Sequence, residues 1–230
     1  MKKILFLLMC VPAATYAQVV GAVTDTKSNN PGEVIDLLPL PPPKLEGTFY
    51  LNDEWIVGDL WLKNNKVIKG FPLKYDLKNQ LLEINTEHGI KVCQLPLIEK
   101  FVIKEPLKDS VKYYNTSVVN NVTFDLPQGI CEVLVNDKVK VLKYQYLEIK
   151  EATYNAAINM GERNDKVLKK ERLYAVVRDE VFELKNKVGK NEEVFGDKTA
   201  QVEDFAKKNG LKLKEDAEII KVFEYYNSLI

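Results

Sequence analysis

Short stretches in which apolar and polar residues alternate with a period of two dominate the first half of the chain. Between residues 71 and 76, phenylalanine, leucine and tyrosine alternate with proline, lysine and aspartate. This alternation is typical of a strand with one buried face. Turn-forming runs such as residues 63–66 and 77–80 separate stretches of this kind. Residues 47–104 are therefore predicted to form an antiparallel β region, folded as a barrel-like or strongly curved sheet.

A second β region, packed on the first, is predicted for residues 105–190. Its strands are expected at residues 131–135 and 139–149, and a hairpin at residues 173–184. A proline in the first region, Pro72, cannot donate a ladder hydrogen bond, so its strand is expected to lie at an edge or to carry a bulge.

The apolar period changes to that of a helix in residues 191–230. Val202, Phe205 and Ala206 lie at helical spacing, and Asn209-Gly210 is a typical helix end. A second apolar stripe, expected to pack on the sheet, consists of Ile219, Ile220, Val222, Phe223, Tyr226 and Leu229. This C-terminal helical hairpin together with the β regions predicts an α+β fold.

The first 17 residues, 1–17, have the features of a cleavable secretory signal peptide. Two lysines precede a short apolar core, residues 4–11, and small residues follow that fit cleavage before Gln18. Residues 18–46 are polar and proline-rich, and we interpret them as an exposed tether. The alternative is a docking peptide for a proline-recognising partner. The protein is thus expected to be exported, to the periplasm or in association with the outer membrane, with an extracellular position as the alternative.

The charges of the chain are balanced, with 33 basic and 33 acidic residues. Removal of the two lysines of the signal takes the formal charge from 0 to −2. Such a surface has no electrostatic preference for nucleic acid or anionic lipid, so neither is an expected partner. No later apolar run approaches the roughly 20 residues of a transmembrane helix, so none is predicted.

The cysteines leave two questions open. Cys10 would suit a lipoprotein signal, but that processing needs a small residue before the cysteine, and Met9 stands there. Cys93 and Cys131 remain after cleavage, and an oxidising compartment permits a disulfide between them. Because both lie in strand-like stretches, two buried thiols are the equal alternative.

Two stretches resemble exported proteins that are common in Bacteroidota. Residues 47–75 begin Gly-Thr-Phe-Tyr-Leu-Asn-Asp-Glu-Trp and end Gly-Phe-Pro-Leu-Lys-Tyr, and residues 194–229 run from Val-Phe-Gly-Asp-Lys to Tyr-Tyr-Asn-Ser-Leu. These are turn and core residues of a family of conserved exported proteins without assigned chemistry. The resemblance implies the envelope of a Gram-negative cell and the fold class, and it implies no active site.

Candidates for catalysis are few. His88 is the only histidine, which excludes zinc sites and mechanisms that need several histidines. Its position in a predicted turn indicates a solvated side chain. A Cys-His dyad with Cys93 is disfavoured, because five residues of extended strand span roughly 16 Å. Glu162, Asn164 and Asp165 lack the ligand spacing of a calcium loop. We predict no catalytic residue, metal site or cofactor.

Two acid–aromatic clusters raise an alternative. Asp53 and Glu54 precede Trp55, and Asp59 lies close to Trp61. Paired carboxylates beside a ring that stacks on a sugar would suit a glycan hydrolase. Exposed acids alternating with core aromatics give the same pattern, and we favour this structural interpretation.

The remaining feature is three pairs of tyrosines: Tyr113 with Tyr114, Tyr144 with Tyr146, and Tyr225 with Tyr226. One of each pair is expected to face outward, where it could contact a ligand or a protein. A buried tyrosine with a bonded hydroxyl is the favoured alternative. Together with the tryptophans of the two acid–aromatic clusters, this gives four candidate ligand-contact residues: Trp55, Trp61, Tyr144 and Tyr146.

The function expected from the sequence is that of a non-enzymatic binding or structural module that contacts another envelope protein. One alternative is a periplasmic hydrolase that acts on glycans through carboxylates. The other is a carrier of a small apolar ligand, which would need an apolar cavity in the β region.

Overall fold

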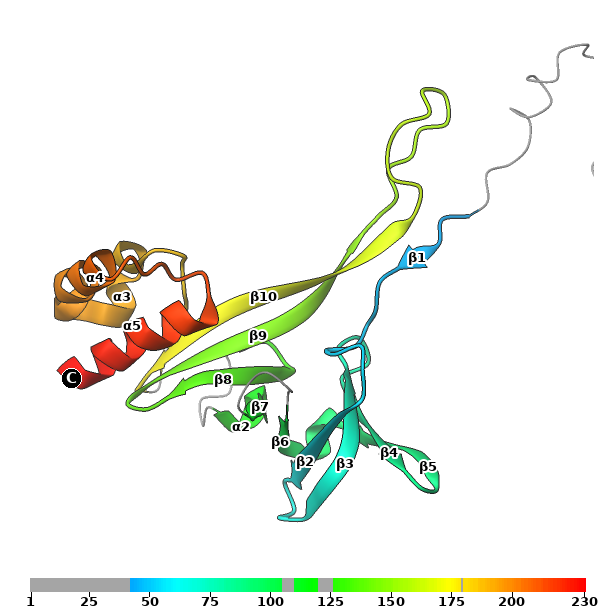
Figure 1. Cartoon of the computed structure of the whole chain (residues 1–230), viewed down its shortest axis with the longest axis horizontal. Helices are drawn as coiled ribbons and strands as arrows, with labels where there is room; N and C mark the ends of the chain where they lie inside the picture. The colour runs from blue at the N-terminus through cyan, green and yellow to red at the C-terminus, as the bar shows by residue number, and fades with distance from the viewer. Residues whose placement is uncertain (1–41, 105–109, 120–125, 179) are drawn as a thin grey trace, which may run out of the picture. The chain divides into compact units, whose positions relative to one another are not determined.

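The computed structural model describes residues 42–104, 110–119, 126–178 and 180–230 (Figure 1). The chain divides into residues 1–42 and residues 43–230, and the fold described below is that of the second unit. The predicted signal peptide and most of the predicted tether lie outside the described residues.

The second unit consists of strands followed by helices. The strands are β1 (Leu45–Glu46), β2 (Ile56–Leu62), β3 (Val67–Asp76), β4 (Leu81–Thr86), β5 (Gly89–Gln94), β6 (Ile98–Ile103), β7 (Val111–Asn115), β8 (Ile130–Asn136), β9 (Val139–Lys150), β10 (Asp165–Val177) and β11 (Glu180–Glu183). The α-helices are α2 (Thr116–Val119), α3 (Glu192–Phe195), α4 (Thr199–Lys208) and α5 (Asp216–Leu229). The α+β class predicted from the sequence is confirmed.

All the described strands belong to one 11-stranded sheet, in the order β1-β10-β9-β8-β7-β6-β2-β3-β4-β5, with β11 also paired to β10. Every pairing is antiparallel except that of β1 with β10. The sheet is neither closed nor strongly curled, so the predicted barrel-like or strongly curved sheet is wrong. Pairing between β6 and β7 joins the strands of residues 47–104 to those of the later region in this single sheet.

Pro72 shows how the strand pairing accommodates a missing N–H. Pro72 lies opposite Val57 of β2, whereas β4 pairs with β3 only from Leu73 onward. On the β4 side, β3 therefore has no pairing at Pro72 and no ladder donor is needed there.

The described residues form three apolar core clusters. The first is formed by side chains of strands β2 to β7 and includes Leu60, Phe101 and Tyr113. The second lies between the C-terminal helices and β8–β10 and includes Val141 and Phe223. The third is built around Cys131, Leu142, Tyr144, Tyr174 and Val176. Because alternate residues of a strand face opposite sides, Val141 and Leu142 place the second and third clusters on opposite faces of the sheet.

The C-terminal helices follow the sequence prediction closely. Helix α4 ends where Gly210 adopts a φ of 64°. The N–H groups of Gly210 and Leu211 then donate to the carbonyls of Lys207 and Ala206, at 3.2 and 2.9 Å. This is the bond pattern of a Schellman cap, which only a residue tolerant of positive φ forms easily.

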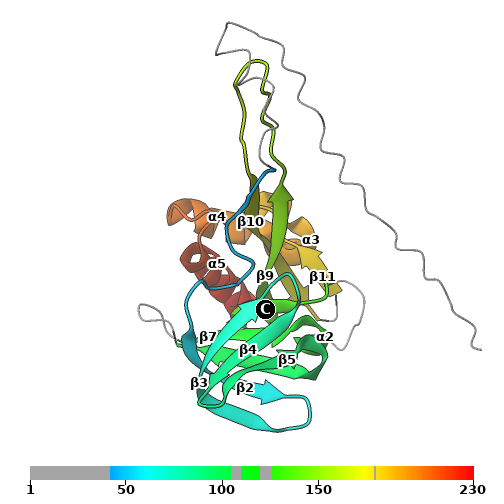
Figure 2. The ribbon, with the colours of Figure 1, turned by 90° about the vertical axis from the view of Figure 1, so that its right-hand side faces the viewer.

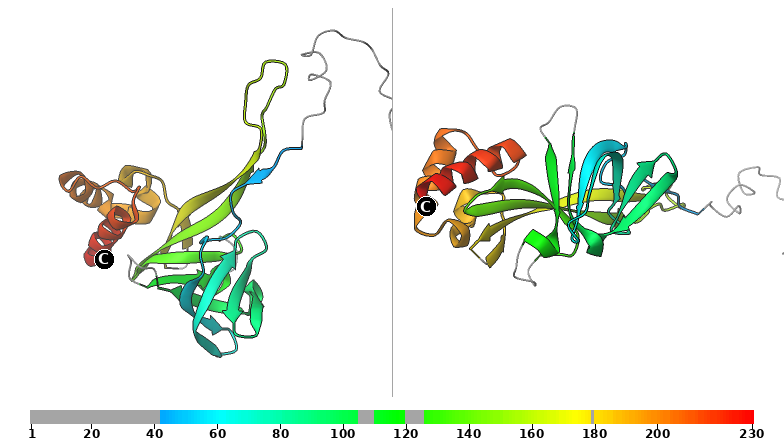
Figure 3. Two further views of the ribbon diagram at one scale, coloured as in Figure 1. Left: turned by 45° about the vertical axis from the view of Figure 1, so that its right-hand side comes forward. Right: turned by 90° about the horizontal axis from the view of Figure 1, so that it is seen from below.

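Helix α5 packs its apolar stripe on the sheet, as predicted (Figures 1 and 3). A buried side chain, Asn227, joins the two. It accepts from the N–H of Val139 at 2.8 Å and donates to the Val139 carbonyl at 3.1 Å. The start of β9 is thus bound to the last turns of α5.

Candidate functional site

The two tryptophans predicted as ligand contacts are half-buried and lie on different parts of the first β region. The ammonium group of Lys100 lies 5.1 Å from the ring centre of Trp61, and that of Lys74 lies 5.9 Å from the ring of Trp55. Both rings are thus in contact with cations of the chain itself. Neither tryptophan lines the two clefts or the void described below.

Tyr144 and Tyr146 lie on the same face of β9, two residues apart, with their ring centres 6.1 Å apart and nearly parallel. Tyr144 is buried, and its hydroxyl donates to the carbonyl of Gln128 at 3.2 Å. The guanidinium of Arg172 lies 5.0 Å from the ring of Tyr146. The structure therefore places both tyrosines in a packed aromatic cluster.

Cys93 and Cys131 are free thiols in this structure, and both are buried. They belong to different apolar clusters, the first and the third. Burial raises the pKa of Cys131 to about 12 and also raises the pKa of Cys93. A thiol that is hard to ionise is a poor nucleophile, so this environment is that of a structural cysteine.

His88 is exposed in the turn between β4 and β5. The continuous strand β5 separates it from Cys93, so no hairpin brings the two side chains together. The oxygens of Glu162 and Asp165 are engaged separately, with Lys166 at 2.8 Å and with the N–H of Ala152 at 2.7 Å. Among the described residues, no three of His, Cys, Asp or Glu are grouped as a metal ion would require.

The structure assembles an ion cluster that the sequence patterns did not single out: Glu132, Lys143 and Asp216. The ammonium of Lys143 lies 2.9 Å from a Glu132 oxygen and 2.6 Å from an Asp216 oxygen. Glu132 and Lys143 lie directly opposite each other on β8 and β9, and Asp216 begins α5. One pattern in the sequence could have indicated this cluster. Alternate residues of a strand face the same side, and Lys143 follows the apolar residues Val139 and Val141 at this spacing.

The ion cluster determines the protonation of Lys143. Burial by itself would lower the pKa of Lys143, because an ammonium group is poorly solvated there. Hydrogen bonds to Asp216 and Glu132, together with their negative charges, outweigh this effect and raise the pKa above its usual value. Lys143 is therefore a cation, and its two acids are held against it.

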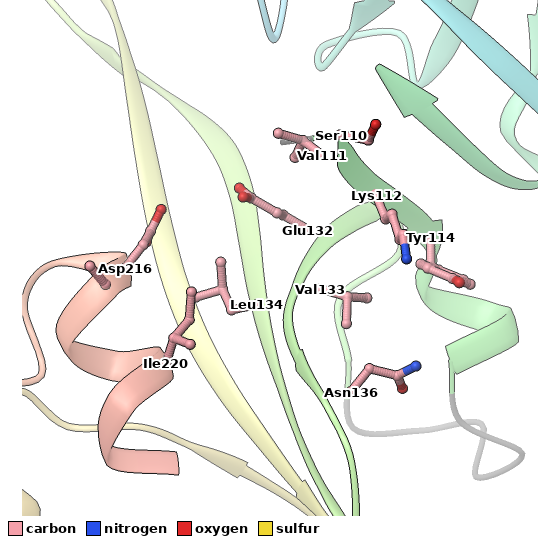
Figure 4. Close-up of a pocket in the computed structure, with 11 residues that line it drawn as sticks. Ser110, Val111, Lys112, Tyr114, Glu132, Val133, Leu134, Asn136, Asp216 and Ile220 are labelled. Carbon is pink, nitrogen blue, oxygen red and sulfur yellow. The ribbon is translucent and has the colours of Figure 1, made fainter. Parts of the chain in front are cut away.

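Two clefts share Glu132. The first, here called the fork cleft, has a volume of about 500 Å³. Figure 4 shows Glu132 and Asp216 on one side of it and Lys112 beside Tyr114 on the other. The second cleft, of about 430 Å³, lies beside Asp53, Glu54, Glu132 and Lys143. The two acids of the fork cleft share one ammonium group, and no tryptophan lines either cleft, so the hydrolase alternative gains no support from the geometry.

The apolar-carrier alternative requires a cavity in the β region. A void among the described core residues, beside Tyr75 and Phe101, measures only about 10 Å³. This is about the room that a single water molecule needs. This void is far too small for an apolar ligand, so it gives the carrier alternative no support.

The chain matches no known protein family, no curated protein and no solved structure. The resemblance to exported proteins of Bacteroidota stays a prediction. Within the described part of the chain, no helix combines the length and the apolar character that membrane crossing demands.

The most exposed apolar feature is a hairpin extension, here called the arm, which comprises residues 145–171 (Figure 2). Strand β8 pairs with β9 only as far as Tyr144, and beyond that residue β9 and β10 pair with each other. Among the described strands, the two-residue β1 is the other partner there, and Lys169 of β10 also donates to the carbonyl of Leu51. The arm carries Ile158 and Met160 at its end, 62% and 64% exposed, the highest values among the large apolar residues described.

Several hydrogen bonds cross the end of the arm. The N–H of Asn155 donates to the carbonyl of Met160 at 2.8 Å, which closes a short turn. The Tyr154 hydroxyl donates to the side-chain oxygen of Asn159 at 2.8 Å, and Arg163 donates to the same hydroxyl oxygen at 3.1 Å. The Arg163 guanidinium also lies 4.6 Å from the Tyr154 ring. The two apolar side chains are therefore presented on a hydrogen-bonded turn.

Proposed function

We propose that this protein is a non-enzymatic exported protein of the cell envelope, which binds another envelope protein through the end of its arm. The observation that supports this proposal is the exposure of Ile158 and Met160 on a hydrogen-bonded, projecting turn. Burial of large exposed apolar side chains by a partner lowers the free energy of the complex. The hydrogen bonds of the turn reduce the conformational entropy that is lost on binding.

The charges of the arm favour a protein partner over a lipid surface. Residues 145–171 carry five basic and five acidic residues: Lys150, Arg163, Lys166, Lys169 and Lys170 against Glu148, Glu151, Glu162, Asp165 and Glu171. A balanced arm is not drawn to anionic headgroups, and two apolar side chains alone give weak membrane binding. A protein groove that covers both side chains provides shape complementarity in addition to apolar contact.

Site-specific photo-crosslinking in the producing cell tests the proposal. A photo-reactive residue at position 158 is expected to give an adduct of defined size with an envelope protein. The same residue at position 90 provides the matched control, because Ile90 is an exposed apolar residue on β5, outside the arm. Equal adducts at both positions, or none at position 158, would overturn the proposal.

Affinity for the protein identified in this way gives a second measurement. Full burial of an apolar side chain is worth about 1.5–3 kcal/mol, and each of these side chains is nearly two-thirds exposed, so the pair contributes roughly 2–4 kcal/mol. The double variant Ile158→Ser/Met160→Ser should therefore bind at least about 30-fold more weakly. The control Val67→Ser/Ile90→Ser, which also removes two exposed apolar side chains, should bind normally.

A further inference from the structure

The fork cleft arises because two neighbouring strands separate. Strands β7 and β8 pair through three residues each, 113–115 with 130–132. Beyond this point β7 continues toward Val111, paired only with β6, and β8 continues toward Asn136, paired only with β9. The edges of β7 and β8 that face the cleft are therefore not paired with any described strand.

A bulge explains the separation. The register between β8 and β9 shifts between Val133 and Val135, so Leu134 is the additional residue. A bulge bends its strand and increases the local twist, which carries the end of β8 away from β7. The N-terminal part of α5 borders one side of the space with Asp216 and Ile220 (Figure 4), and Ala217 also lines the cleft.

We propose that the fork cleft binds an extended peptide segment of a partner protein, which adds to the free edge of β8 and places a lysine or arginine beside Glu132 and Asp216. Open strand edges bind extended peptides through backbone hydrogen bonds, and side-chain pockets supply the specificity. The free edge of β8 comprises residues 133–136, which fits a segment of about four or five residues at roughly 3.3 Å per residue. The volume of about 500 Å³ is within the usual range of ligand sites.

The charge of the cleft selects the basic side chain. Glu132 and Asp216 both line it, whereas Lys143, which they share, lies among the lining residues of the second cleft instead. Two carboxylates against one ammonium leave the ion cluster with a charge of −1, and the side chain of Asp216 is 35% exposed. Among the described residues that line the fork cleft, Lys112 carries the positive charge. It lies beside Tyr114, away from Asp216 (Figure 4). A cation is therefore favoured at the α5 end of the cleft.

Peptide titration monitored by NMR of the labelled protein tests this site. The probe is an acetylated, amidated pentapeptide Val-Lys-Val-Thr-Val, and its partner probe has glutamate in place of lysine. The lysine peptide is expected to shift the amide signals of residues 133–136 and 111–112, and the glutamate peptide is expected to bind at least about tenfold more weakly. Shifts confined to other residues, no shifts at millimolar peptide, or equal binding of both peptides would overturn the proposal.

A steric variant with a matched control locates the binding. Ala217→Trp places a large side chain at the lining of the cleft, and because Ala217 is exposed the fold should tolerate it. Ala200→Trp makes the same change at an exposed alanine of α4 outside the cleft. Ala217→Trp should weaken the lysine peptide at least about tenfold and Ala200→Trp should not; equal effects of the two variants would contradict the site. The arm takes no part in these measurements, so either proposal can fail alone.

Discussion

Replacement of Lys143 by methionine tests how much the ion cluster contributes to the stability of the fold. The Lys143 side chain is 7% exposed and that of Glu132 is 11% exposed, so this contact is nearly buried. The change keeps most of the length of the unbranched side chain, which becomes one atom shorter, and removes its charge. The Glu132 carboxylate is then left in the protein interior without its cation.

The expected loss follows from these exposures. Removal of one partner of a buried pair typically costs 3–5 kcal/mol, and because Glu132 borders two clefts that water can enter we expect about 3 kcal/mol. The contact with Asp216 is 35% exposed and adds at most about 0.5 kcal/mol. The pKa of Lys143 is raised in the folded state, so its contribution is complete below the ordinary lysine pKa of about 10.4 and is lost as the pH rises through the folded value.

Urea unfolding followed by circular dichroism measures the effect, with Lys169→Met as the matched control. Lys169 pairs with Asp53 at 3.2 Å, but those side chains are 35% and 67% exposed, so the same substitution should cost less than about 1 kcal/mol.

A double variant separates the charge from the packing. Lys143→Met/Glu132→Leu removes both ions and is expected to lie within about 1 kcal/mol of the natural protein. A Lys143→Met cost no larger than that of Lys169→Met would refute the reasoning. A double variant as unstable as the single one would refute it too.

Three further predictions concern the helices and the cysteines. Gly210→Ala should cost about 1 kcal/mol in urea unfolding, since its φ is 64° and no atom lies within 4 Å of an added Cβ; Gly210→Asn should cost less, and the reverse order would contradict the Schellman cap. Asn227→Leu should cost about 2 kcal/mol, because both backbone groups of Val139 lose their partner; a cost near zero would show that these bonds do not stabilise the docking of α5. Cys93 and Cys131 should react slowly with a thiol reagent at pH 8 because burial raises the pKa of both, and both should react after unfolding without reductant; failure to find these two thiols would indicate a disulfide.

Local patterns determined much of this protein from its sequence alone. The end of α4 at Gly210 and the apolar stripe of α5 depend on residues within a few positions of one another, and both are confirmed. The alternation around Phe71, Leu73 and Tyr75 likewise predicts a strand, and β3 forms there. Helical and strand periods are local properties, so one stretch of chain contains them completely.

Only the tertiary structure decided whether the strands close into a barrel and which charges meet. Closure depends on the twist and pairing of distant strands, and no single stretch records it. Glu132 and Asp216 are 84 positions apart (216 − 132), and they meet at Lys143 because α5 folds back on β8 and β9. The fork cleft has the same origin, since it requires a bulge in β8, an early end to the pairing with β7 and a helix that closes the side. Periodicity contains no information about contacts between such distant segments, so the site became visible only in the folded chain.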